Sequence, residues 1–114
     1  MVLVSLATAS ICFLGACYPA LVGKTTPAGT FSLSLQRTPE PGYGGDVLVY
    51  HEDRQNLWAI HRVYTRNASE HRIERLNDQR TEQRRSVTQG CINVMPEVYR
   101  KLVDCCSNDI LVIH

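Results

Sequence analysis

Short apolar runs separated by glycine and proline turns are the feature that most constrains this fold. The runs are rich in Val, Ile, Leu and aromatic residues, and the run at 31–35 alternates strictly between apolar and polar positions. Turns and loops rich in Gly and Pro lie between the runs. The runs span residues 2–6, 11–13, 16–22, 31–35, 46–51, 57–63 and 109–113. The pattern predicts a mainly β domain of the α+β class.

Only one segment of the chain has the periodicity of a core helix. Pro96 suits the first helical position, and Glu97 suits the positive end of the helix dipole. Val98 and Leu102 then fall on one apolar face. A chain of 114 residues can build one domain with its own core, and a second domain is not expected. We therefore predict a single domain over residues 1–114, with one helix near its end.

The apolar N-terminal stretch, residues 1–17, has two interpretations. It ends in Leu14-Gly15-Ala16-Cys17, which is similar to a bacterial lipoprotein cleavage box, so that Cys17 would carry a lipid anchor. A signal peptide has Lys or Arg before its apolar core, and this stretch has neither. The alternative is a set of strands with a turn at Leu14-Gly15. We favour the strands, because removing this stretch would leave fewer than a hundred residues for the core.

Residues 64–86, here called the insert, interrupt the β pattern with a charged stretch. Seven of the twelve basic residues lie between Arg62 and Arg85, against four acidic ones. Only Ile73 and Leu76 pair as apolar residues at helical spacing, which is too little for a core helix. The excess charge suits either an anionic ligand or a solvated, salt-bridged surface, and the second is the more common. We predict a partly helical flap over a site, and no nucleic-acid binding, because interleaved aromatics are lacking.

The five cysteines form an odd set, so at least one is left unpaired if the chain is secreted. Cys12 and Cys17 suit a pairing across a hairpin, whereas Cys105 and Cys106 are adjacent in sequence and are awkward partners. Cys91 is the candidate for the free thiol.

Cys91 is also the candidate nucleophile. It follows Gly90, which allows a sharp turn, and it precedes the helix that begins near Pro96. Backbone amides in such a turn and a helix N-terminus favour a thiolate and can stabilise an oxyanion. A single cysteine in this setting is more often an inert, buried side chain, so the motif needs a second group.

His61 is the best candidate for the base that a cysteine nucleophile needs. It ends a strand-like run, where a pocket rim can hold it rigidly, although a single histidine is more often structural. The other three histidines precede a polar turn, lie in the charged insert or end the chain. No set of ligands recurs at metal-binding spacing, and no phosphate-binding loop is present, so we expect neither a metal nor a cofactor.

Three separated motifs occur in this chain in a fixed order. The first is Val22-Gly23-Lys24 with the following residues 26–31 (TPAGTF), the second is Ala59-Ile60-His61, and the third is 88–93 (TQGCIN). Together they resemble the L,D-transpeptidase family, whose catalytic domain is of the YkuD type and whose signature reads Ser/Thr-His-Gly-Cys-apolar-Asn/Arg. Gln89 stands where many members have histidine. The step of 30 residues from His61 to Cys91 is longer than usual, and we attribute the excess to the insert.

The resemblance implies a β-sandwich or barrel that transfers acyl groups between peptidoglycan stem peptides. Cys91 would attack the carbonyl that joins a diamino acid to D-Ala, and His61 would accept the thiol proton. The amides of Gly90 and Cys91 would stabilise the oxyanion. Thr88, Gln89 and Asn93 would shape the turn and the substrate pocket.

The resemblance leaves the acyl acceptor open. A second stem peptide would give a cross-link, water would give an L,D-carboxypeptidase, and a lipoprotein amine is a third acceptor. A non-catalytic module that binds the cell envelope is the competing hypothesis. Each of these places the protein in the periplasm or cell envelope.

Overall fold

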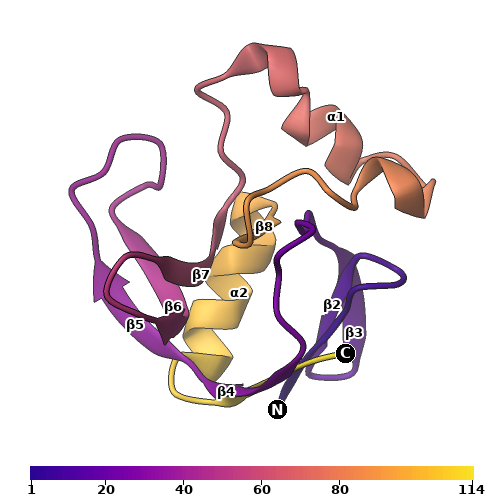
Figure 1. Cartoon of the computed structure of the whole chain (residues 1–114). Helices are drawn as coiled ribbons and strands as arrows, with labels where there is room; N and C mark the ends of the chain where they lie inside the picture. The colour runs from indigo at the N-terminus through magenta and orange to yellow at the C-terminus, as the bar shows by residue number, and fades with distance from the viewer.

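The computed structural model describes all residues from 1 to 114 and contains two separate β-sheets (Figure 1). The first sheet has the strand order β3-β2-β1-β9-β4 and the second has the order β5-β6-β7-β8. The strands of the first are β1 (Val2–Ser5), β2 (Ser10–Phe13), β3 (Ala16–Pro19), β4 (Gly29–Ser32) and β9 (Ile110–Ile113). Those of the second are β5 (Ser34–Arg37), β6 (Asp46–Glu52), β7 (Leu57–Arg62) and β8 (Ile92–Val94).

One helix and one apolar core join the two sheets. Helix α2 spans Pro96–Cys106, which confirms the predicted helix and its proline start. Val4, Leu48 and Leu102 come from the first sheet, the second sheet and α2, and all three are fully buried in one cluster of 19 residues. Each such aliphatic side chain contributes roughly 1.5–3 kcal/mol by its burial. The largest apolar cluster therefore spans both sheets and α2.

The predicted strand at 31–35 is divided between the two sheets. It breaks at buried Leu33, whose N–H donates to the Asp109 carbonyl at 2.9 Å, and β4 and β5 continue on either side of the break. Near the edges of the sheets, Leu21, which follows β3, forms an isolated bridge with Asn93 of β8, but the strands remain in two separate sheets. The molecule is thus a sandwich, and the alternative of a closed barrel is wrong.

Residues 1–17 form strands, as favoured from the sequence. The turn between β2 and β3 contains Leu14 and Gly15, both with positive φ, and Cys12 faces Cys17 across this hairpin in a disulfide. A lipid anchor at Cys17 needs a free thiol, which this pairing does not leave. Adjacent Cys105 and Cys106 are also bonded, against expectation, at the end of α2.

The insert is partly helical, with α1 (Arg72–Leu76) between two 3-10 helices, Ala68–Glu70 and Thr81–Gln83. Leu76 is buried against Leu21 and Val63, whereas Ile73 is exposed. Arg84 is also buried, and it donates to the carbonyls of Thr8 and Ala9 at 2.9 and 3.1 Å. Leu76 and Arg84 therefore help to attach the insert to the body of the molecule.

None of the helices has the length and apolar character that crossing a membrane requires.

Candidate active site

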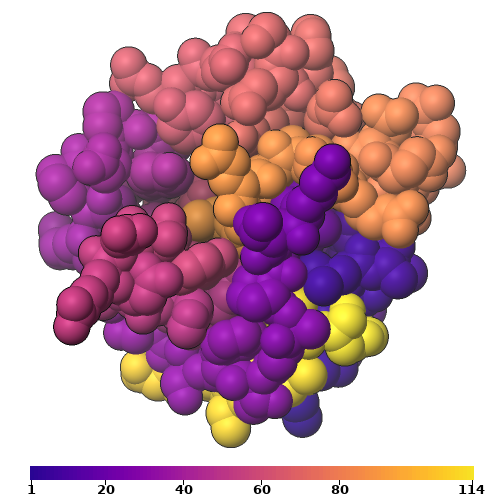
Figure 2. All heavy atoms as spheres, in the orientation of Figure 1, coloured from indigo at the N-terminus to yellow at the C-terminus, as the bar shows by residue number.

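A cavity of about 540 Å³ opens on one face of the molecule. Figure 2 shows the hollow between the β5–β6 loop, the β6–β7 turn, the insert and the segment that precedes β8. Four of the predicted site residues line it, namely Cys91, His61, Thr88 and Gln89. Asn93 lies beneath the wall and is fully buried, and Gly90 lies behind Cys91 outside the lining.

The pairing of β7 with β8 brings the two halves of the site together. These strands run parallel, and their register sets His61 opposite Asn93, two residues after Cys91. Parallel neighbours cannot be joined by a tight turn and need a crossover of about a dozen residues or more. The insert belongs to this crossover, which explains the long step from His61 to Cys91.

The first motif of the sequence supports the turn that carries Cys91. Gly23 lies so close to this turn that a Cβ there would be 2.2 Å from the Thr88 carbonyl oxygen. Thr25 donates its hydroxyl to the Gln89 carbonyl at 2.8 Å, and Thr26 donates to the Gly90 carbonyl at 2.9 Å. The Gly-x-Thr-Thr stretch and the cysteine turn are therefore one structural unit.

Only one of the two amides expected to bind an oxyanion is unoccupied. Gly90 has φ +132° and donates its N–H to the Thr88 hydroxyl at 3.2 Å. The same hydroxyl donates to the Cys91 carbonyl at 2.6 Å, which closes the turn. The N–H of Cys91 has no acceptor within the chain. The Cys91 amide, and not that of Gly90, is thus without an acceptor in the chain.

Cys91 is the free cysteine, and its thiol is partly buried. The Sγ atom lies 3.8 Å from the Leu57 carbonyl oxygen, to which it donates. Burial raises the pKa of the Cys91 thiol, while the Ala59 N–H and the charge of Arg72 lower it by less. The sulfur therefore carries its proton at neutral pH and needs a base before it can attack.

His61 is buried and held in one tautomer. Its Nδ1 lies 2.7 Å from the Arg62 carbonyl oxygen, which can only accept, so Nδ1 carries the proton and Nε2 carries the lone pair. The Asn93 amide donates to Nε2 at 3.4 Å, so this lone pair must be released from Asn93 before it can take a proton from another group. Burial lowers the pKa of His61 to about 4, with a smaller lowering from Arg72. The imidazole is therefore neutral at pH 7, as a general base must be.

No hydrogen bond joins His61 to Cys91 in this structure. Tyr43 lies beside both: its ring centroid is 4.5 Å from that of His61, and its side chain packs in the cluster that includes Cys91. Direct proton transfer therefore requires the two side chains to approach each other within the cavity.

Three contributors to the site were missed from the sequence. The Arg62 carbonyl orients His61, but a backbone group leaves no sequence signal. Tyr43 lies in a glycine-rich stretch that we read only as a loop. Arg72 lies in the charged insert, where most arginines are indeed salt-bridged or bonded to carbonyls, as in the pair of Arg80 with Asp78. Arg72 is also salt-bridged, to Glu70, but it lines the cavity as well and donates to the Asn93 side-chain oxygen at 2.9 Å.

No three His, Cys, Asp or Glu side chains gather where they would hold a metal ion.

No protein-family model matches this sequence, and no curated protein matches it. Solved structures do. An L,D-transpeptidase from Xylanimonas cellulosilytica superposes with a TM-score of 0.63 at 14% identity, over 99% of this chain and 59% of that one. L,D-transpeptidase 1 of Mycobacterium tuberculosis superposes with a TM-score of 0.59 at 17% identity, over 99% of this chain and 60% of that one. An L,D-transpeptidase from Mycobacterium smegmatis gives 0.58 and 18%, over 99% and 57%.

The chain has the fold of the L,D-transpeptidases. The predicted sandwich with a helix after the cysteine turn is thereby confirmed. The chain spans less than two thirds of the length of each of these structures.

Proposed function

We propose that this protein is a cysteine acyltransferase of the L,D-transpeptidase type, which acts on peptidoglycan stem peptides in the cell envelope. The observation that carries the proposal is the content of one cavity. A free thiol with an unoccupied backbone N–H shares this cavity with a neutral histidine whose tautomer is fixed. The fold shared with solved L,D-transpeptidases supports the choice of reaction.

In the first half-reaction, the Sγ proton of Cys91 passes to Nε2 of His61, and the thiolate attacks the carbonyl carbon between the diamino acid and D-Ala. The Cys91 N–H stabilises the oxyanion that forms. Collapse of this intermediate breaks the C–N bond, His61 returns its proton to the leaving amine, and free D-Ala departs. A thioester on Cys91 remains.

In the second half-reaction, an amine of another stem peptide attacks the thioester. His61 takes a proton from the amine, the C–S bond breaks, and the sulfur leaves as the thiolate and regains a proton. Water in place of the amine would release a tripeptide, which is the L,D-carboxypeptidase outcome. Thr88 and Gln89 are placed to contact the peptide because both line the cavity.

The second candidate is a non-catalytic module that binds the envelope. One observation favours it, namely the missing hydrogen bond between His61 and Cys91. The free, partly buried thiol argues against it, because a cysteine without a role in turnover needs no place in the cavity wall.

A tetrapeptide stem tests the proposal. Incubation with the native protein should give an intact-mass increase equal to the tripeptide acyl group, together with one equivalent of D-Ala, and Cys91→Ala should give neither. Adding a second stem or water-only buffer then identifies the acceptor from the released product. Binding of the peptide without an adduct or D-Ala release would support the envelope-binding module instead.

A further inference from the structure

We infer that Arg72 is the carboxylate-recognition residue of the cavity, and that its guanidinium binds a carboxylate of the donor peptide beside the scissile bond. The inference rests on the function proposed above and adds to it a requirement for substrate charge.

Arg72 has N–H groups without an acceptor, and its side chain is largely shielded from solvent. Its side chain is 12% exposed and lines the cavity. Of the five N–H groups of a guanidinium, one donates to Asn93 at 2.9 Å and one to Glu70 at 3.2 Å. The Nε atom is buried and has no acceptor. Nε is closed off from the cavity, but one N–H on each terminal nitrogen also has no acceptor within the chain, and carboxylates match the geometry of such a pair of donors.

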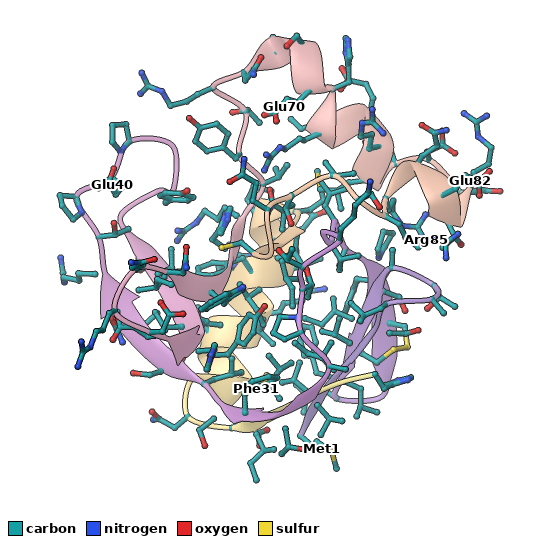
Figure 3. All side chains as sticks on the ribbon, in the orientation of Figure 1. Met1, Phe31, Glu40, Glu70, Glu82 and Arg85 are labelled. Carbon is teal, nitrogen blue, oxygen red and sulfur yellow. A yellow bond between two sulfur atoms is a disulfide. The ribbon has the colours of Figure 1, made fainter.

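The present partner of Arg72 is itself a carboxylate. Glu70 contacts one terminal nitrogen of Arg72 through a single oxygen, and its own side chain is 32% exposed. It can therefore turn towards solvent when a second carboxylate arrives. Figure 3 shows Glu70 on the insert and Glu40 on the β5–β6 loop, and of these two cavity-lining carboxylates only Glu70 pairs with Arg72.

The other buried or paired arginines of the insert are already occupied. Arg75 donates to the carbonyls of Glu70 and Gln83, Arg80 pairs with Asp78, and Arg84 donates to backbone carbonyls. Arg66 also lines the cavity, but it is exposed to solvent. Arg72 is thus the insert arginine that combines burial, a place in the cavity and an unused donor.

Arg72 is also close to the reacting groups. The Asn93 side chain that it contacts lies 3.4 Å from Nε2 of His61, and the charge of Arg72 lowers the pKa of both His61 and Cys91. A carboxylate on Arg72 would therefore lie about one side chain away from the base. The donor peptide has carboxylates near the scissile bond at the terminal D-Ala and on the diamino acid side chain. The chemistry is the same for both.

Three peptides distinguish these two sources. The first is the tetrapeptide stem, and the second is the same stem with a carboxamide in place of the terminal carboxylate. The third has lysine at the third position in place of a diamino acid that bears a side-chain carboxylate. The rate of Cys91 acylation is measured by intact mass for the native protein, Arg72→Gln, Arg72→Lys and the control Arg80→Gln, whose arginine lies on the same insert outside the cavity.

The native protein and Arg80→Gln should acylate one of the two altered peptides roughly 10- to 100-fold more slowly than the parent, as the loss of a charge-assisted hydrogen bond implies. Arg72→Gln should acylate the parent and that peptide at similar rates, and Arg72→Lys should recover part of the difference. The peptide that is discriminated identifies the carboxylate.

Two results would overturn the inference while the proposed function stands. In one, the native protein acylates all three peptides equally. In the other, Arg72→Gln slows all three by the same factor, which would mean that Arg72 acts only by holding Asn93. If none of the three peptides acylates Cys91, the proposed function and the inference are both refuted.

Discussion

The cavity has two walls that are held in place by different forces. On the sheet side, β7 and β8 hold His61 and the residues after Cys91 through a ladder, above fully buried Ile60 and Ile92. On the insert side, Leu76 is the one fully buried aliphatic anchor, and most contacts are polar. We propose that the two walls have different roles. The sheet wall carries the reacting groups, and the insert wall carries the groups that select a substrate.

Replacing His61 is the largest perturbation of the sheet wall. His61→Ala should lower the rate of Cys91 acylation by about 10²- to 10⁴-fold, because a positioned general base is lost. His51→Ala is the matched control, since His51 lies on neighbouring β6, is exposed and does not line the cavity. Equal rates for both variants would mean that the sheet wall does not supply the base.

The burial of His61 should also appear as a pH dependence of stability. The pKa of His61 is about 4 in the folded protein, against 6.5 for an unperturbed histidine. Between these values the unfolded chain binds a proton that the folded protein does not, so the free energy of unfolding falls as the pH falls. The loss reaches about 3 kcal/mol near pH 4 and is absent above about pH 6.5.

Urea unfolding of the native protein and of His61→Gln at several pH values checks this expectation. The variant should lack the fall in that window. Asp53, Asp78 and Asp109 have lowered pKa values and lose their contribution to stability below about pH 5, but they are the same in both proteins, so the comparison cancels them. Parallel pH profiles for the two proteins would show that His61 is not held neutral by the sheet wall.

A smaller effect is expected when the insert is detached from the body. Arg84→Ala removes the guanidinium from the Thr8 carbonyl and from the Ala9 carbonyl, which keeps the Ala20 N–H, and this loss should lower the free energy of unfolding by about 2 kcal/mol. Arg85, which is exposed and is labelled in Figure 3, supplies the control, and Arg85→Ala should change it by less than about 0.5 kcal/mol. Similar values for both would mean that Arg84 does not anchor the insert.

The same division explains what the sequence could predict. The strands and the helix at Pro96 follow from local patterns of alternation, glycine turns and helical spacing, whereas the roles suggested for His61 and Cys91 came only from the resemblance of three separated motifs to a known family. The split at Leu33 did not follow, since it depends on a contact with Asp109 far along the chain. Arg72 was hidden for a similar reason: nothing local distinguishes the one arginine that the crossover carries into the cavity.

The insert also shows why a charged stretch is hard to interpret. Its salt-bridged arginines fit the expectation of a solvated surface, as in the pair of Arg80 with Asp78. Its buried arginines do not fit this expectation. Burial depends on how the chain packs, which composition does not report. The parallel pairing of β7 with β8 is the feature that makes the insert a wall of the site.

The most direct test of the account is whether Cys91 acts as a nucleophile in the folded protein. A carbapenem-type β-lactam, which acylates a cysteine by opening its ring, should add once to the native protein, and peptide mapping should find the adduct on Cys91. Cys91→Ala should show no adduct. If the folded protein has a Cys91 thiol that a thiol reagent titrates and yet forms no β-lactam adduct, the account of this cavity as an acyl-transfer site is wrong.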